Sequence, residues 1–476
     1  MRHLTAPFSG SYTAEFGEAF LPCMDFGSKE GNLQMPNRTS NVEAAASHPG
    51  VDELRRLFKE NRAGKRRGIY AVCSANRLVL EAAFARAKQD RSPLLIEATS
   101  NQVNQEGGYT GQTPAQFRDY VHSIAKDLGF PTERLILGGD HLGPNPWRAE
   151  PAEAAMEKAC AMVSAYAAAG FSKIHLDASM ACRDDSHILA NEEIAERAAR
   201  LCEVAESATR ACSGKPVYVI GTEVPTPGGA QEKMEIEVTS TASLKETLDV
   251  HHRAFSGKKL LSAWERIIGV VVQPGVEFGN ETVADYVPEK ASELSQSILQ
   301  QEGIVFEAHS TDYQTAESLR QLVNGHFGIL KVGPELTFAM REAIFGLARI
   351  EEEWIAGDRR SQIRAVIERV MVAHPEHWKA YYRGDESQVR VARGYSLSDR
   401  IRYYWPNSEI SKALALLIQN LQECPAPLPL VAQYLPRQAA AIRAGAISNN
   451  PIAIIHHKIQ ESLARYADAC GLMPGE

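Results

Sequence analysis

The sequence predicts an α/β protein built as a (β/α)8 TIM barrel with a helical appendix at its C-terminal end. Eight short apolar runs, rich in β-branched residues and bounded by turn residues, recur from residue 68 onward. Each run is followed by a longer segment whose apolar positions have helical spacing. Eight parallel strands with eight helices indicate a closed barrel, although the spacing alone also permits an open doubly wound sheet.

Each predicted strand precedes one predicted helix along the chain. The strands are expected at residues 68–73, 93–98, 135–139, 173–178, 217–221, 267–272, 304–308 and 327–332. The helices are expected at residues 78–89, 114–128, 151–169, 191–212, 241–254, 283–300, 316–324 and 335–352. Beyond residue 352 the strand-like runs stop, and helical segments separated by prolines follow. We therefore expect a mostly disordered extension over residues 1–50, the barrel over 51–352 and the appendix over 353–476.

The composition is that of an ordinary soluble protein, with 44% hydrophobic and 23% charged residues. No apolar run is long enough to cross a bilayer, and the N-terminal residues lack the apolar core of a secretory signal, so we expect a cytoplasmic protein. The net charge of -8 offers no basic stripe for a nucleic-acid backbone, which argues against nucleic acid as a partner. The eight cysteines form no C-x-x-C pair and are expected to stay reduced.

Polar residues interrupt the ends of nearly all predicted strands, where barrel enzymes place their chemistry. Asp140 and His141 are the most informative pair, because adjacent residues at a strand end can diverge. One can then bind a metal while the other acts as general base. His141, His309 and Glu223 would supply nitrogen and oxygen ligands suited to zinc or a similar divalent ion.

The remaining polar residues at the strand ends are predicted to bind substrate. Alternation along a strand places His175 and Asp177 on one face, so these two side chains should point together. The predicted substrate-binding residues are Glu97, Asn101, His175, Asp177 and Lys331.

Phosphate-binding residues are expected after the seventh and eighth strands, where hydroxyls, amides and a helix N-terminus commonly hold a phosphate. Ser310, Thr311 and Gly333 lie there, although Gly333-Pro334 also reads as a simple helix start. Farther along, residues 394–405 combine two arginines with four aromatic residues. This segment either caps a phosphate-bearing pocket, with Arg400 as the phosphate ligand, or forms an interface, or packs within the appendix.

Seven stretches of the sequence carry a family resemblance. They are residues 68–74, 96–102, 139–144 (GDHLGP), 221–225 (GTEVP), 272–278, 306–312 (FEAHSTD) and 394–406. On these motifs the chain, from about residue 51 onward, closely resembles the Z-type subunit family of bacterial D-tagatose-1,6-bisphosphate aldolase. Members of this family are often labelled tagatose-6-phosphate kinases.

The resemblance implies a class II aldolase-like barrel and a role in galactitol, tagatose or galactosamine breakdown. It matches Asp140-His141 to the base-plus-ligand pair, and His309 to a second ligand, of class II aldolases, which use three histidines. The further histidine expected near the sixth strand stands here as Gln273. This difference makes Gln273 or Glu223 the replacement metal ligand.

The resemblance leaves three functions to weigh. The first is a metal-dependent 4-epimerase that interconverts D-tagatose 6-phosphate and D-fructose 6-phosphate by retro-aldol chemistry at C3-C4, with Asp140 or Glu223 as the base. No G-x-G-x-x-G fingerprint supports a nicotinamide cofactor for this reaction. The second is a non-catalytic accessory subunit, in a hetero-oligomer with a catalytic aldolase subunit; a homo-oligomer is the other expected assembly. The third, a kinase, is weakened because no P-loop occurs, so no ATP is expected.

Overall fold

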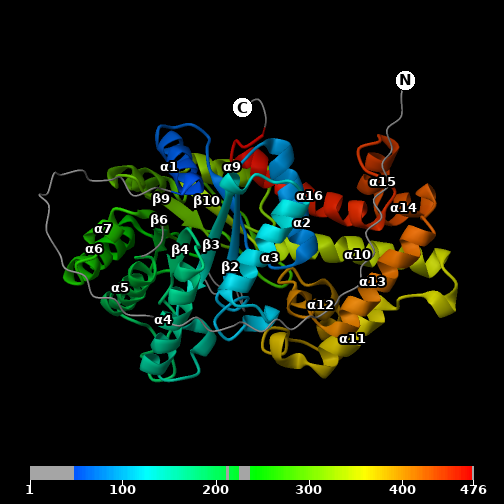
Figure 1. Ribbon diagram of the computed structural model, residues 1–476, viewed down its shortest axis with the longest axis horizontal. Helices are drawn as coiled ribbons and strands as arrows, with labels where there is room; N and C mark the ends of the chain where they lie inside the picture. Colours follow the sequence, from blue (N-terminus) through cyan, green and yellow to red (C-terminus); the bar gives the residue numbers. More distant parts are fainter. Residues whose placement is uncertain (1–47, 211–213, 225–235, 474–476) are drawn as a thin grey trace, which may run out of the picture. The chain divides into compact units, whose positions relative to one another are not determined.

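The computed structural model describes residues 48–210, 214–224 and 236–473. Eight parallel strands close into a barrel in which each strand pairs with its neighbours along the chain and the last pairs with the first (Figure 1). The strands are β1 (Ile69–Val72), β2 (Leu94–Thr99), β3 (Leu135–Leu142), β4 (Lys173–Leu176), β5 (Val217–Ile220), β6 (Ile267–Val271), β9 (Val305–Ala308) and β10 (Phe327–Val332). The predicted closed barrel is confirmed, and the open sheet is excluded.

Helices surround the barrel near the predicted positions. They are α2 (Arg77–Asp90), α3 (Pro114–Asp127), α4 (Ala152–Ala168), α5 (Asn191–Ala208), α6 (Thr241–Gly257), the short α7 (Leu261–Trp264), α8 (Ser292–Ser297), α9 (Ala316–Asn324) and α10 (Pro334–Trp354). Four of them begin where the sequence carries a capping side chain, because Asn76, Thr113, Ser240 and Thr315 each accept a first-turn backbone N–H.

The helix predicted over residues 283–300 is largely wrong. Val283–Ala284 forms the short strand β8, which pairs antiparallel with β7 (Glu277–Phe278), and only Ser292–Ser297 is α-helical, followed by a 3-10 turn. Pro288 explains part of the difference, because proline disfavours helical backbone at the residue before it. The predicted end of the helix at residue 212 and Pro225 of the 221–225 motif lie outside the described residues, as does the predicted extension up to residue 47.

Helix α1 (Pro49–Arg62) was not among the predicted helices. It buries Val51, Leu54, Leu57 and Phe58. It packs against the first residues of β3 and β10, and a Cβ added at Gly328, near the start of β10, would lie 3.2 Å from the Phe58 ring. Helix α1 therefore covers the end of the barrel where the strands begin. This leaves the carboxyl ends of the strands as the open end.

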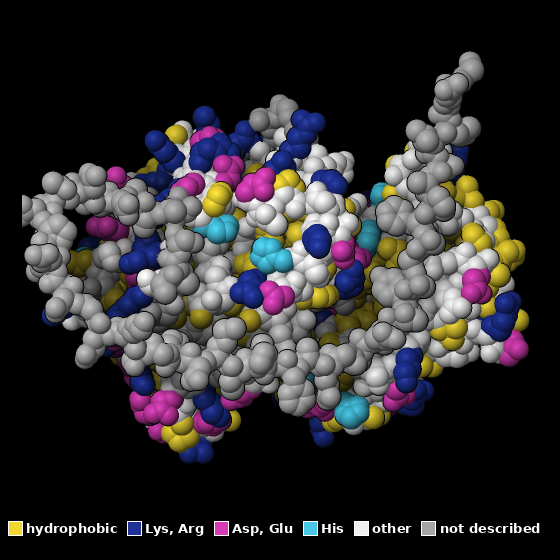
Figure 2. Space-filling view, viewed as in Figure 1, with side chains coloured by type: hydrophobic (Ala, Val, Ile, Leu, Met, Phe, Trp, Pro, Cys, Tyr) yellow, Lys and Arg dark blue, Asp and Glu magenta, His cyan; other side chains and the backbone are white. Residues whose placement is uncertain are grey.

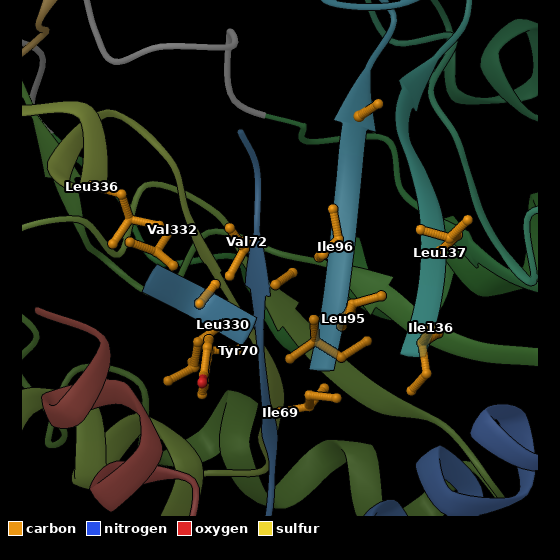
Figure 3. Close-up of a cluster of buried hydrophobic side chains, with 14 of the residues drawn as sticks. Ile69, Tyr70, Val72, Leu95, Ile96, Ile136, Leu137, Leu330, Val332 and Leu336 are labelled. Carbon is orange, nitrogen blue, oxygen red and sulfur yellow. The ribbon is translucent and has the colours of Figure 1, made fainter. Parts of the chain in front are cut away.

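The strands are buried along nearly their whole length, as expected for a parallel sheet covered by helices. Figure 3 shows part of this core, in which apolar side chains of β1, β2, β3 and β10 meet a residue of α10. The labelled residues are Ile69, Tyr70, Val72, Leu95, Ile96, Ile136, Leu137, Leu330, Val332 and Leu336.

The C-terminal region is helical. Its helices are α11 (Ile363–Ala373), α12 (Glu386–Tyr395), α13 (Ser408–Glu423), α14 (Leu428–Tyr434), α15 (Pro436–Arg443) and α16 (Pro451–Ala469), with a 3-10 segment η7 (Arg400–Tyr403). Helices α11 to α15 lie to one side of the barrel, whereas α16 returns and packs against α2, α9 and α10 (Figure 1). The division of the chain at residue 352 stays a prediction, but α16 is part of the layer around the barrel.

Two hydrogen bonds join α16 and the residue after it to the segments next to β1 and β9. The backbone N–H of Gly68, just before β1, donates to the carbonyl of Cys470 at 3.1 Å. The Tyr466 hydroxyl donates to the carbonyl of Thr311 at 2.7 Å, in the loop after β9.

Among the described residues, no helix is long and apolar enough to span a membrane. Lys and Arg side chains are interspersed with Asp and Glu over the face shown in Figure 2.

Candidate metal centre and pocket

A bulge at the end of β3 presents both Asp140 and His141 to the open end of the barrel. The pairing of β3 with β4 shifts register between Gly139 and Leu142, and His141 has a positive φ of 48°. A bulge re-aims side chains that would otherwise alternate between the two faces of the sheet. A non-glycine residue with positive φ is uncommon and must be held by its surroundings. Adjacent residues can therefore line one site, as the sequence suggested.

Three imidazoles from three strand ends meet beside Asp140. The ring centres are 4.8 Å apart for His141 and His309, 5.3 Å for His141 and His175, and 5.2 Å for His175 and His309. All three rings are buried. Four tetrahedral positions around a divalent ion, with nitrogens at about 2.1 Å, would place such ring centres roughly 5 Å apart. The three rings have about this spacing, and the ligand atoms that lie within 4.8 Å of one another belong to His175 and His309, together with Asp140 and Glu307.

Each of these imidazoles has one ring nitrogen within hydrogen-bond distance of a carboxylate oxygen. His141 Nδ1 lies 2.8 Å from Asp177 Oδ2, His175 Nδ1 lies 2.9 Å from Asp140 Oδ1, and His309 Nε2 lies 2.9 Å from Glu307 Oε1. Metal-bound histidines commonly donate their second ring N–H to a carboxylate, which fixes the ring and frees the other nitrogen. His175 Nε2 is buried with no hydrogen-bond partner among the described residues. A metal ion would give this nitrogen a partner.

The charges at this point favour a cation. Burial alone would lower the pKa of His141, but Asp140 and Asp177 outweigh it and raise that pKa to about 9. Burial alone would likewise raise the pKa of Asp140, yet His141, His175 and His309 hold it well below its ordinary value. Asp140 is thus an ionised carboxylate. Asp140, His175, Glu307 and His309 also offer ligand atoms within 4.8 Å of one another, so a buried cluster that can hold a metal is present.

A second buried layer of charges lies around this cluster. Lys173 Nζ contacts Glu97 Oε1 at 2.6 Å and Glu307 Oε2 at 2.7 Å, and all three side chains are fully buried. Lys331 Nζ contacts Glu97 and lies 2.9 Å from Asp140 Oδ1. Because Glu307 in turn holds His309, the two lysines fix the acids that orient the site.

A pocket of about 350 Å³ opens above the cluster. Of the predicted site residues, those that line it are Asn101, Asp140, His141, His309, Ser310, Lys331 and Gly333. Glu97, His175 and Asp177 belong to the buried cluster that these residues contact. Most of the predicted catalytic and substrate-binding residues therefore come together at one end of the barrel.

Two predicted ligands lie elsewhere. Glu223 is exposed and accepts a hydrogen bond from Thr239. Gln273 is half-buried, and its Oε1 accepts the backbone N–H groups of Gly275 and Val276 at 2.8 and 3.0 Å. The structure brings neither residue into the histidine cluster, where His175 supplies the third imidazole. Their roles as base or metal ligand stay predictions without a supporting contact.

Of the predicted phosphate-binding residues, only Ser310 and Gly333 line the pocket. Thr311 Oγ1 donates to the Lys331 carbonyl at 2.6 Å, inside the fold. At the start of α10, Asp312 Oδ1 accepts the backbone N–H groups of Gly333 and Glu335 at 3.0 and 2.8 Å. A carboxylate thus occupies the helix N-terminus that the sequence suggested for phosphate. Burial, together with the charge of Glu335, raises the pKa of Asp312 to about 7.

The C-terminal region supplies part of the pocket. Arg402, Tyr403 and Trp405 line it, whereas Arg400 lies behind and stacks on Tyr381, with its guanidinium carbon 3.1 Å from the ring centre. Tyr109 meets Tyr403 edge to face at a ring-centre distance of 4.8 Å. The sequence singled out this segment and named Arg400, whose role as a phosphate ligand stays a prediction. Arg402 and Asp312 were missed, and local patterns contain no signal that separates Arg402 from Arg400.

The family comparison is decisive once this geometry is known. Residues 54–471 match the model of the family described as D-tagatose-1,6-bisphosphate aldolase subunit GatZ/KbaZ-like. The chain belongs to this family. The family resemblance drawn from the sequence motifs is thereby confirmed.

Three solved structures are similar to the chain, and the first of them has the same fold. A probable tagatose 6 phosphate kinase from Sinorhizobium meliloti 1021 is 46% identical, with a TM-score of 0.79, covering 85% of this chain and 100% of its own. A fructose-bisphosphate aldolase from Campylobacter jejuni is 16% identical, with a TM-score of 0.43, covering 79% of this chain and 93% of its own. The YdjI aldolase from Escherichia coli K12 is 13% identical, with a TM-score of 0.39, covering 76% of this chain and 98% of its own. The first of these structures supports the fold, and the match to the GatZ/KbaZ-like family model places the chain in that aldolase-subunit family.

Proposed function

We propose that the chain is a metal-dependent ketose-phosphate 4-epimerase that interconverts D-tagatose 6-phosphate and D-fructose 6-phosphate. The observation that carries this proposal is the set of three buried imidazoles, each oriented by a carboxylate, beside an ionised Asp140 at the floor of the pocket. A barrel that serves only as a scaffold has no need of such a set, in which His175 Nε2 is buried without a hydrogen-bond partner among the described residues, at a cost of about 1–3 kcal/mol.

His141, His175 and His309 would hold a divalent ion, for which zinc is our choice because nitrogen ligands in this number suit it. When bound, the ion supplies Lewis acidity that polarises the ketose carbonyl and stabilises negative charge on the neighbouring oxygens. Asp177, Asp140 and Glu307 keep the three rings oriented through their second nitrogens. The side-chain positions thus prepare one face of the pocket for the C2–C3 end of a ketose.

Asp140 is the proposed base. Its carboxylate takes the proton of the C4 hydroxyl as the C3–C4 bond breaks, and C4 becomes the aldehyde carbon of glyceraldehyde 3-phosphate. The electron pair of the broken bond stays on the fragment that contains C2 and C3, as an enediolate. Rotation of the released glyceraldehyde 3-phosphate presents its other face. The electron pair then re-forms the C3–C4 bond, and Asp140 returns its proton to the C4 oxygen. Glu223 is not favoured for this role, because its side chain is exposed and does not line the pocket.

The sequence of steps requires that the aldehyde stay in the pocket between cleavage and re-addition. Tyr109, Tyr403 and Trp405 line the pocket from segments outside the strands, and the rings of Tyr109 and Tyr403 contact each other edge to face. Restricting the exchange with water favours re-addition over escape.

An accessory subunit of a catalytic aldolase is the second candidate. The family description, which names an aldolase subunit, favours it, and so do the exposed apolar side chains of Val372, Val391 and Tyr395 on the C-terminal helices. In that case the chain would form a hetero-oligomer and would not turn over sugar phosphates alone. A cytoplasmic location is expected for either function.

One experiment separates the two candidates. The purified chain, with and without added zinc, is incubated with D-tagatose 6-phosphate while D-fructose 6-phosphate is followed by NMR. Asp140→Asn should reduce the rate at least 100-fold, whereas Asp358→Asn, at an exposed aspartate of the C-terminal region, should leave it unchanged. No conversion by the wild-type chain, together with a higher melting temperature on addition of an aldolase subunit, would support the accessory role and refute the epimerase.

A further inference from the structure

Two neighbouring arginines of η7 are held in the fold without a carboxylate partner. Arg400 is 2% exposed, and neither its Nε nor its Nη2 has a hydrogen-bond partner among the described residues. Arg402 bonds to the carbonyls of Ser398 and Asp399 and to the Tyr403 hydroxyl, the last at 3.0 Å. Neither guanidinium has a carboxylate oxygen within 4.0 Å in the described part of the chain.

The acid on this segment forms its ion pair with another arginine. Asp399 is buried, and its carboxylate lies 3.6 Å from the guanidinium of Arg341. The group formed by Arg341, Asp399, Arg400 and Arg402 thus carries three positive charges and one negative charge. Burying charge without a partner is costly, and arginines are rarely buried unless they are paired. The excess positive charge beside the pocket indicates an anionic ligand.

We infer that Arg402 binds the phosphate group of the substrate at the outer end of the pocket, with the charge of Arg400 behind it adding to the attraction. This inference rests on the proposed sugar-phosphate substrate and names the residue that selects it. The guanidinium fork is suited to phosphate oxygens, and three hydrogen bonds to the protein leave Arg402 further N–H donors for a ligand.

The surroundings hold Arg402 in place. Its guanidinium carbon lies 4.5 Å from the centre of the Tyr403 ring. His377 stacks on the same ring, with a ring-centre distance of 4.8 Å and an interplanar angle of 11°. Tyr109, from the loop after β2, meets the same ring edge to face. A fork fixed in this way loses little conformational entropy when it binds phosphate.

The alternative phosphate position at the start of α10 is disfavoured. Asp312 already accepts the Gly333 and Glu335 N–H groups there, so an incoming phosphate would lose those donors and face a carboxylate. Lys331 lines the pocket too, but its ammonium group is engaged with Glu97 and Asp140. Arg402 is the better partner. The ketose end of the ligand then meets the histidine cluster, and its phosphate end meets the C-terminal segment.

Binding of unreactive ligands tests this inference without requiring turnover. D-mannitol 6-phosphate and D-mannitol are titrated into the wild-type chain and into Arg402→Gln, Arg402→Lys and Arg390→Gln by calorimetry. The last variant is the matched control, because Arg390 is an exposed arginine of the preceding helix α12. Circular dichroism and melting temperature show whether each variant folds.

We expect the wild-type chain to bind D-mannitol 6-phosphate at least tenfold more tightly than D-mannitol. Arg402→Gln should abolish this preference and leave the affinity for D-mannitol unchanged within a factor of two. Arg402→Lys, which keeps the charge, should retain only part of the preference for D-mannitol 6-phosphate. Arg390→Gln should retain all of this preference. If Arg402→Gln does not fold, the lysine variant still decides, because a full preference in that variant contradicts a role for the fork.

The inference is overturned if Arg402→Gln keeps the preference, or if the wild-type chain has none. Failure of the proposed epimerase is a different result. It would appear as absent conversion of D-tagatose 6-phosphate by a wild-type chain that still prefers the phosphorylated hexitol through Arg402.

Discussion

Replacing Lys173 by methionine should destabilise the fold more than any single loss of a surface ion pair. The ammonium group lies 2.6 Å from Glu97 and 2.7 Å from Glu307, and none of the three side chains is exposed. Methionine fills a similar volume but leaves both carboxylates with one cation fewer, so that Lys331 alone must balance them. Removing one partner from a buried ion pair costs about 3–5 kcal/mol, and we expect a loss of unfolding free energy of that size.

Urea unfolding of the wild-type and variant chains measures this loss, through the midpoint and slope of the transition. Lys245→Met is the control, because Lys245 pairs with Asp249 on the surface, where its side chain is 75% exposed, and its loss should have no measurable effect. Adding Glu307→Gln to Lys173→Met should restore part of the stability, because the amide needs no cation and its oxygen can still accept from His309. A loss below about 1 kcal/mol for Lys173→Met would refute the assignment of Lys173 as the cation that balances these acids.

Three further outcomes are expected. The pKa of Asp312 is raised from 3.8 to about 7, so the folded chain keeps a proton that the unfolded chain releases, and the free energy of unfolding should fall as the pH rises from about 4 to 7. Asp312→Asn should remove this fall and raise the melting temperature at pH 8. An unchanged pH profile in the variant would contradict this role of Asp312. His175→Asn should lower the zinc bound per chain, measured by mass spectrometry after dialysis, at least tenfold, whereas His252→Gln at an exposed position should not. Ending the chain after Gly445 removes α16 and should prevent cooperative folding, seen as loss of a thermal transition; a folded product would show that α16 is dispensable.

The barrel could be predicted because each of its units is a local pattern. A buried apolar run followed by a helical period predicts one strand and one helix, and eight repetitions predict closure. The pattern failed at residues 283–300, where a two-stranded pair forms instead of a long helix. Each strand of this pair has only two residues, which is too short for the alternation of apolar and polar residues that marks a strand. Helix α1 escaped prediction because it lies at the edge of a polar segment that resembled an extension.

The site was predicted in its members more than in its arrangement. His141, His309 and Asp140 come together as expected, but the third imidazole is His175, which the sequence assigned to substrate binding. Which strand ends face one another depends on strand register and on the bulge at His141, and both are properties of paired strands. The choice between Arg400 and Arg402 depends on how a distant segment folds over the barrel. Neither property is present in a local pattern.

The position of α16 has a consequence for how the protein is made. A ribosome synthesises the chain from its N-terminus, and domains generally begin to fold in that order. Yet the helical layer beside β1 and β10 is completed by residues 451–469, the last helix to emerge. The eight strands are all available long before this helix, so the nascent barrel carries an uncovered apolar seam until translation is nearly finished. Early termination anywhere in the C-terminal region would leave that seam exposed, and truncated products should be targets for chaperones and proteases.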